Sequence, residues 1–289
     1  MSVHDSDKNE LLAMLEWQLE MGADEAIVDN RNFSEESSFV SENCDEQYGV
    51  DTAPVKTPNS TFRIVKETKK ILGEKNLFVP NPSLSPHQNA IDCSEKMSWI
   101  KTLTDLRKNL DIFDGCELKK TASNLCFSDG NPGAQLMIIG EAPSRDEDRM
   151  GVPFVGPSGD LLDRILASFS LDRSSVYLTT LLPWRPPGNR TPTEEEISIL
   201  LPWLYRHIQI LSPKCILVLG GMAAKLIFCQ NDSILKLRGV WRETNFGNGV
   251  CLPVIASLHP SYLIRVPAQK QLAFEDFMDV ATKLKLLGL

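Results

Sequence analysis

The chain has 289 residues, of which 42% are apolar and 24% are charged, a composition that excludes fibrous and fully disordered proteins. Its seven cysteines are scattered and include no Cys-x-x-Cys pair, which argues against a disulfide framework. No stretch approaches the roughly 18 apolar residues of a membrane-spanning helix and the N-terminus lacks a signal-peptide pattern, so we expect a cytoplasmic protein.

The net charge of −8 is unevenly distributed along the chain. Residues 1–95 carry 18 acidic and 8 basic side chains, whereas residues 96–289 carry 20 acidic and 22 basic ones. The acidic excess therefore belongs to the first third of the chain. The remainder is mildly basic and can present a local basic face to an anionic partner.

The N-terminal third divides into two segments. Leucines within residues 8–21 recur at helical spacing, which predicts an amphipathic helix in an N-terminal segment spanning 1–29. Residues 30–96 are rich in Ser, Asp, Glu, Asn and Pro without sustained periodicity, so we expect an acidic, polar linker that stays disordered. We expect the helix to dock on the main domain. Binding of an unknown protein by this acidic arm is the alternative.

A regular alternation of strands and helices begins at residue 97. Strands are expected at 135–140, 175–182, 214–220 and 252–258, and helices within 161–169, at 194–211, from about 221, and at 268–286. Strands that are apolar throughout, separated by helices, are typical of a parallel sheet covered on both faces. We therefore predict an α/β fold, a three-layer α/β/α sandwich, for residues 97–289.

The loops that follow the predicted strands carry the most unusual chemistry in the sequence. Ligands of parallel sheets bind beyond the carboxyl ends of the strands. Three of the four strand exits read "GEAPSRDED" from Gly140, "PWRPPGNR" from Pro183 and "HPSYLIR" from His259. Because these exits lie at one edge of the sheet, we expect the three loops to form one site.

Together these motifs resemble family 4 of the uracil-DNA glycosylase superfamily. The resemblance rests on "GEAPSRDEDRMGVPFVGPSG" (140–159), "RPPGNRTP" (185–192) and "HPSYLIR" (259–265), which agree in order and strand placement. It implies a central sheet of four parallel strands. It also implies a hydrolase that flips uracil out of DNA, cleaves its N-glycosidic bond and starts base-excision repair.

The resemblance implies three catalytic residues. His259 matches the histidine that stabilises the departing uracil anion, in the manner of an oxyanion-hole donor. Glu141 and Glu147 match glutamates that line the active site and orient water or stabilise the sugar cation, tasks to which a carboxylate is suited. Ala142 stands where another branch of the superfamily carries an aspartate base, so the sequence leaves the water-activating residue open.

The base pocket is expected around Gly140, Ala142, Phe154 and Thr180. Phe154 matches the aromatic residue on which uracil stacks. Thr180 stands where the family usually has an asparagine that both donates to and accepts from the base, and a hydroxyl cannot reproduce this pairing. The sequence therefore leaves two alternatives open: a glycosylase for another deaminated base such as hypoxanthine, and a catalytically weak DNA-binding protein of the same fold.

A further group of matched residues is expected to bind DNA. The group comprises Ser158, Gly159, Arg185, Arg190, Ser261, Tyr262, Leu263 and Arg265. The first two begin a helix whose backbone N–H groups can hold a phosphate. The arginines are candidate phosphate contacts. The remaining three match the loop that contacts the phosphate of the flipped nucleotide and wedges the gap it leaves.

Members of family 4 typically hold a [4Fe-4S] cluster on four cysteines. The matching positions here are Phe113, Cys116, Trp184 and Leu200, so one thiolate of the four is present. Cys126 lies nearby in the sequence, but two cysteines do not make a site. We therefore predict no cluster and no other cofactor, with apolar packing in place of the metal.

Overall fold

The computed structural model describes residues 85–288. The predicted helix within 8–21 and most of the expected linker lie outside the described residues. The strands are β1 (Asp129–Gly130), β2 (Leu136–Gly140), β3 (Val176–Thr180), β4 (Cys215–Leu219), β5 (Arg242–Asn245) and β6 (Cys251–Ser257). The helices are α2 (Pro86–Lys96), α3 (Leu103–Ile112), α4 (Leu118–Thr121), α5 (Arg145–Met150), α6 (Pro157–Ser168), α7 (Glu194–Leu211), α8 (Gly221–Phe228), α9 (Ile234–Leu237), α10 (Pro260–Arg265) and α11 (Lys270–Leu286), with short 3-10 turns at Pro187–Asn189 and Pro267–Gln269.

The sheet has the order β1-β3-β2-β4-β6-β5. Its inner strands β3, β2, β4 and β6 are parallel, and the registers Ile138↔Leu178 and Leu217↔Ile255 bring their carboxyl ends to one edge. The predicted α/β fold is confirmed, but the sheet has six strands rather than four. The additional strands β1 and β5 pair antiparallel at the two edges. They escaped prediction because one has two residues and the other, "RETN", has no apolar run.

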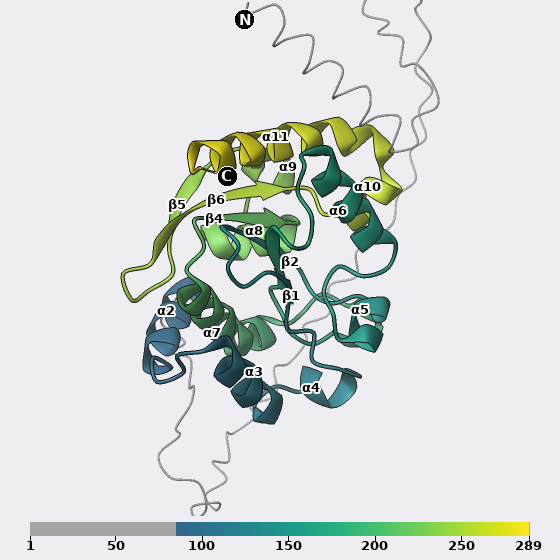
Figure 1. Ribbon diagram of the computed structural model, residues 1–289. Coiled ribbons are helices and arrows are strands. Elements are labelled where there is room, and N and C mark those ends of the chain that lie inside the picture. Colours follow the sequence, from purple (N-terminus) through teal and green to yellow (C-terminus); the bar gives the residue numbers. More distant parts are fainter. Residues whose placement is uncertain (1–84, 289) are drawn as a thin grey trace, which may run out of the picture. The chain divides into compact units, whose positions relative to one another are not determined.

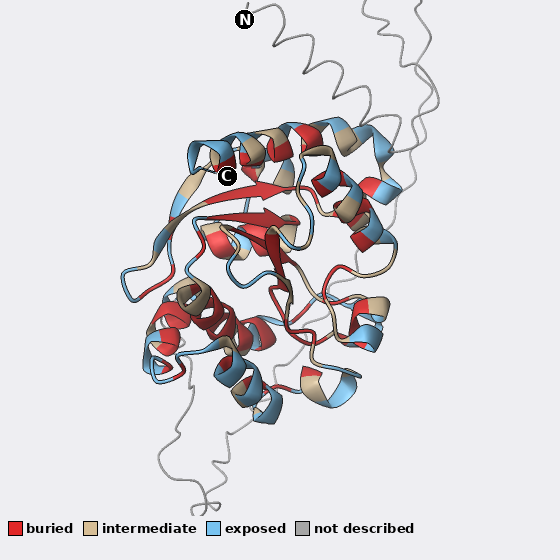
Figure 2. Ribbon diagram, viewed as in Figure 1, coloured by how far each residue is buried: buried red, intermediate tan, exposed pale blue. Residues whose placement is uncertain are grey.

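Helices cover both faces of this sheet, as Figure 1 shows for α2, α3 and α7 on one side and α6, α10 and α11 on the other. Successive strand residues point to opposite faces, so β2 sends Met137 and Ile139 into one apolar core and Leu136 and Ile138 into the other. The inner strands are buried along their length, and the helices expose their outer faces (Figure 2). Between residues 85 and 288, no helix has the length and apolar character needed to span a membrane.

Helix α2 begins eleven residues before the predicted start of the domain. The prediction of a disordered linker is wrong for residues 86–96, because this short segment is amphipathic within an otherwise polar stretch. Ser85 caps the helix, and Ile91 is buried in the core shared with α7. His87 Nδ1 lies 2.5 Å from the Tyr205 hydroxyl, and Gln209 Nε2 donates to Ser94 Oγ at 2.9 Å. The folded domain therefore includes α2.

Because α2 packs on α7, we expect the free energy of unfolding to depend on this contact. Ile91→Ala should lower the free energy of unfolding by about 2 kcal/mol, near the lower end for truncation of a buried isoleucine, because the side chain retains 8% exposure. Lys96→Ala on the exposed face of α2 is the matched control and should change stability by less than about 0.5 kcal/mol. Urea unfolding of the full chain measures both, and equal effects would contradict the packing.

Candidate active site

A cleft of about 420 Å³ lies beside the carboxyl ends of the inner strands, within the range of about 300–1,000 Å³ that is common for small-molecule sites. It is lined by Glu141, Ala142, Pro143, Ser144, Glu147, Ser158, Pro186, Asn189, Arg190, Thr191, Pro192, Met222, His259, Ser261 and Arg265. The three motif loops therefore meet, as their positions after the strands predict. The exit of β4, for which no site residue was predicted, contributes Met222 from the start of α8.

The tautomer of His259 follows from its position at the start of α10. Its Nδ1 accepts the backbone N–H of Ser261 at 3.2 Å and lies 2.8 Å from the Ser261 hydroxyl oxygen. A backbone N–H can only donate, so the proton of the neutral ring sits on Nε2. Burial, reinforced by the positive charge of Arg265, lowers the pKa of His259 to about 4. The ring is therefore a neutral hydrogen-bond donor at neutral pH.

Glu141 is held by the start of α8. One carboxylate oxygen accepts the backbone N–H of Met222 at 2.7 Å, an arrangement that the positive end of a helix favours. Burial raises the pKa of the Glu141 carboxyl, while the backbone N–H groups of Met222 and Ala223 and the charge of Arg265 oppose the rise. A Cβ atom on Gly220 would lie 2.5 Å from the same oxygen. Glycine at this position, which also has a φ of +110°, therefore allows the carboxylate to approach the helix.

Glu147 binds backbone groups with both carboxylate oxygens. Oε2 accepts the N–H of Ser144 at 2.6 Å, and Oε1 accepts the N–H of Phe154 at 2.5 Å. The Ser144 hydroxyl in turn receives the N–H of Glu147, which completes a capping box at the start of α5. Glu147 lines the cleft, but these bonds direct its carboxylate to the loop and suit it to holding Phe154.

Phe154 adopts a left-handed backbone conformation, with a φ of +54°, which is uncommon for an aromatic residue. Its ring is buried and lies 6.0 Å from the His259 ring, with 22° between the planes. A Cβ atom on Gly140 would lie 2.8 Å from the Phe154 ring, so glycine leaves room for it. Phe154 therefore packs against two elements of the cleft without belonging to its lining.

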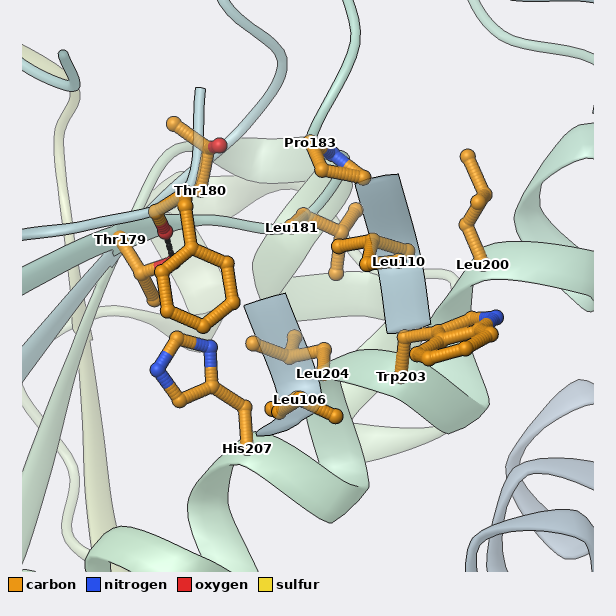
Figure 3. A pocket seen from close by; sticks show the side chains of 11 residues that line it. Leu106, Leu110, Thr179, Thr180, Leu181, Pro183, Leu200, Trp203, Leu204 and His207 are labelled. Carbon is orange, nitrogen blue, oxygen red and sulfur yellow. Dashed lines mark hydrogen bonds between the residues drawn. The ribbon is translucent and has the colours of Figure 1, made fainter. Parts of the chain in front are cut away.

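Thr180 does not line the cleft, and its predicted place in the base pocket is wrong. Its hydroxyl donates to the carbonyl oxygen of Leu182 at 2.7 Å, because the chain turns sharply where β3 ends. The side chain instead lines a separate cavity of about 20 Å³ together with Trp203 and His207 (Figure 3). This volume suffices for about one water molecule, which excludes a nucleobase.

Among the residues expected to bind DNA, Ser158, Arg190, Ser261 and Arg265 line the cleft. Arg190 forms a double hydrogen bond with Glu196, at 2.6 and 2.9 Å. This pair joins the Arg-Pro-Pro loop to the start of α7, where Glu196 and Thr193 form a second capping box. Arg190 therefore already has an anionic partner, whereas Arg265 lies beside His259 and Glu141 in the same cleft.

The other residues expected to bind DNA lie outside the cleft lining. Leu263 is 0% exposed and belongs to the core beneath α6 and α11, so its predicted insertion into DNA is wrong. It occupies the inner side of α10, and Tyr262 packs partly against the same core. A Cβ atom on Gly159 would overlap the carbonyl oxygen of Phe154. Arg185 donates through Nε to the Asn189 side chain at 2.7 Å.

The four positions that match the family's cluster ligands do not fit an iron–sulfur cluster. Cys116, Trp184 and Leu200 are buried in the core around α7, and Phe113 packs against it. Burial raises the pKa of the Cys116 thiol, which disfavours the thiolate that iron requires. Within residues 85–288, no group of three or more His, Cys, Asp or Glu side chains could hold a metal ion. One thiol among three apolar side chains cannot supply four ligands.

Comparisons with known proteins agree with this geometry. The model of the uracil DNA glycosylase superfamily matches residues 127–281. The type-4 uracil-DNA glycosylase of Archaeoglobus fulgidus is 37% identical over 186 residues, which cover 63% of this chain and 92% of that protein. The type-4 uracil-DNA glycosylase of Thermotoga maritima is 33% identical over 176 residues, covering 60% and 90%. The predicted resemblance is confirmed: the chain belongs to the uracil DNA glycosylase superfamily.

Proposed function

We propose that this protein is a uracil-DNA glycosylase, which hydrolyses the N-glycosidic bond of uracil in DNA and so starts base-excision repair. The observation that carries the proposal is His259, a neutral ring whose protonated Nε2 is the nitrogen left for a ligand in the cleft. The names of the type-4 relatives support uracil as the substrate. The target nucleotide must leave the base stack to reach such a site.

His259 stabilises the leaving base in this mechanism. As the bond between sugar and base breaks, negative charge develops on the uracil oxygens. A neutral Nε2–H donates a hydrogen bond to this charge, and a single preorganised donor of this kind lowers a barrier by about 3–4 kcal/mol. Arg265, which lines the same cleft, adds positive charge near His259.

Glu141 stabilises the sugar in this mechanism. The departing base leaves positive charge on the deoxyribose, as in other reactions with an oxocarbenium-like transition state. Glu141 is fixed by the Met222 N–H and faces the cleft, so its carboxylate can lie close to that charge. Glu147, with both oxygens bound to backbone N–H groups, acts by holding Phe154. Ala142 supplies no base, and the proposal assigns the orientation of the attacking water to Glu141 as well, since it lines the cleft.

DNA is held at the edge of the cleft in this proposal. Ser158 lies in the first turn of α6, where a helix N-terminus favours a phosphate. Arg265 and Ser261 line the cleft from the opposite loop. Phe154 packs behind His259, which itself lines the cleft. Binding of a protein by the acidic arm and a cytoplasmic location stay predictions, since residues 1–84 lie outside the described part of the chain.

A glycosylase for another deaminated base, such as hypoxanthine, is the second candidate. It is favoured by one observation: the Thr180 hydroxyl donates to Leu182 O and lies in a separate cavity. No side-chain amide at this position can then read the edge of uracil. The two candidates share His259 and Glu141 and differ in the base that the cleft accepts.

Excision assays separate these functions. The protein should release uracil from an oligonucleotide, detected as an alkali-cleavable site, and should be tested in parallel on hypoxanthine, xanthine and mispaired thymine. His259→Ala should slow uracil excision by about 10²- to 10³-fold, the usual effect of losing one such donor. His87→Ala is the matched control outside the cleft and should retain activity. Release of hypoxanthine but not uracil would favour the second candidate, and inactivity on every base would refute both.

The proposal includes catalysis without an iron–sulfur cluster. Protein purified anaerobically should contain no stoichiometric iron and show no broad visible absorption, because three of the four ligand positions are apolar. Cys116→Ala should preserve uracil excision. A brown protein with near-stoichiometric iron would contradict the proposal and would require ligands other than these four positions.

A further inference from the structure

Arg173 lies at the centre of a charged network between α6 and β3. Its Nε donates to both carboxylate oxygens of Asp163 at 2.9 and 3.2 Å, and its Nη1 donates to Asp129 at 2.6 Å. The third nitrogen, Nη2, donates to the backbone carbonyl oxygen of Phe154 at 2.5 Å. The guanidinium therefore connects α6 and β1 to the loop that carries Phe154.

Phe154 is bound by a charged side chain on each side of its backbone. Its N–H donates to Glu147 and its C=O accepts from Arg173. A left-handed conformation such as that of Phe154 persists in a bulky residue only where its surroundings impose it. Hydrogen bonds to ionised groups are stronger than those between neutral groups, so the two side chains can impose it.

Space for this contact is provided by Gly159. A Cβ atom at this position would overlap the Phe154 carbonyl oxygen and would lie 3.4 Å from Arg173 Nη2. Any other residue would displace the carbonyl that Arg173 binds. The second glycine of "GPSG" is therefore accounted for by the Phe154 carbonyl, without a DNA phosphate.

We infer that Arg173 is a positioning residue for excision, one that orients the Phe154 ring beside His259 by holding the Phe154 carbonyl. The inference rests on the proposed function and extends it to a residue outside the cleft. With the carbonyl and the N–H both fixed, the ring stays against Gly140 and 6.0 Å from the His259 ring. His259, which lines the cleft, is then backed by an aromatic ring held in one position.

Arg173→Lys tests this role because a lysine keeps the charge but cannot donate to three partners in a fixed fork. Single-turnover excision of uracil should slow about 10- to 100-fold, as small displacements of positioning groups do. Arg164→Lys on the exposed side of α6 is the matched control and should leave the rate unchanged. Equal rates for Arg173→Lys and the unmodified protein would overturn the inference.

A double-mutant cycle with Phe154→Ala distinguishes positioning from a general loss of stability. If Arg173 acts through the Phe154 ring, Arg173→Lys should slow excision little further in a chain that already lacks that ring. Multiplicative losses in the two variants would overturn the inference.

Hydrogen exchange of the Phe154 amide gives a readout that does not depend on activity. Exchange should accelerate in Arg173→Lys and stay unchanged in Arg164→Lys, because the first variant alone releases the Phe154 loop. An unchanged Phe154 amide would overturn the inference. If Arg173→Lys accelerates exchange but the unmodified protein excises no uracil, the proposed function is refuted. The structural contact between Arg173 and Phe154 is then still supported.

Discussion

Capture of backbone N–H groups by glutamate carboxylates is the interaction on which the cleft depends. Glu147 joins Ser144 to Phe154, Glu141 accepts the Met222 N–H in the first turn of α8, and Glu196 caps the start of α7. Each glutamate satisfies groups that a helix start leaves without a partner inside the helix. Parallel strands bring these loops to one edge of the sheet, and the carboxylates then fix their conformations. The loops that line the cleft are thereby held in fixed positions.

Apolar packing and one ion pair stabilise the Arg-Pro-Pro loop. Trp184 is buried in the core around α7, and the N–H of Cys126 donates to Pro183 O at 2.9 Å. The pair between Arg190 and Glu196 ties the far end of the loop to the same helix. In this pair Glu196 is buried and Arg190 is partly exposed, while the Trp184 indole is fully enclosed by the core.

Much of the fold could be predicted because its signals are local. Apolar runs identified the four inner strands, and the motifs at their exits identified the cleft. The edge strands could not be found, since β1 has two residues and all four side chains of β5 are polar. Helix α2 was missed within a polar segment, although Ser85 followed by Pro86 is a typical helix start.

The loops that line the cleft were more predictable than the orientation of their side chains. Glu147 was placed in the cleft, yet the spacing of Ser144 and Glu147 already matched a capping box, which indicates a carboxylate directed at backbone. Leu263 faces the core because α10 turns it inward, and six residues give too little periodicity to reveal that face. Thr180 turns to Leu182 O, a contact set by the backbone after β3.

The protonation of His259 is the most direct measure of the proposed chemistry. Nitrogen-15 labelling of the four histidines, with His259 assigned from a His259→Ala spectrum, reports both the tautomer and the pKa. We predict a neutral ring protonated on Nε2 at neutral pH and down to about pH 5, with charging only as the pH falls through about 4. A ring that titrates near its ordinary value of about 6.5, or one that carries its proton on Nδ1, would contradict a neutral Nε2–H donor in the cleft.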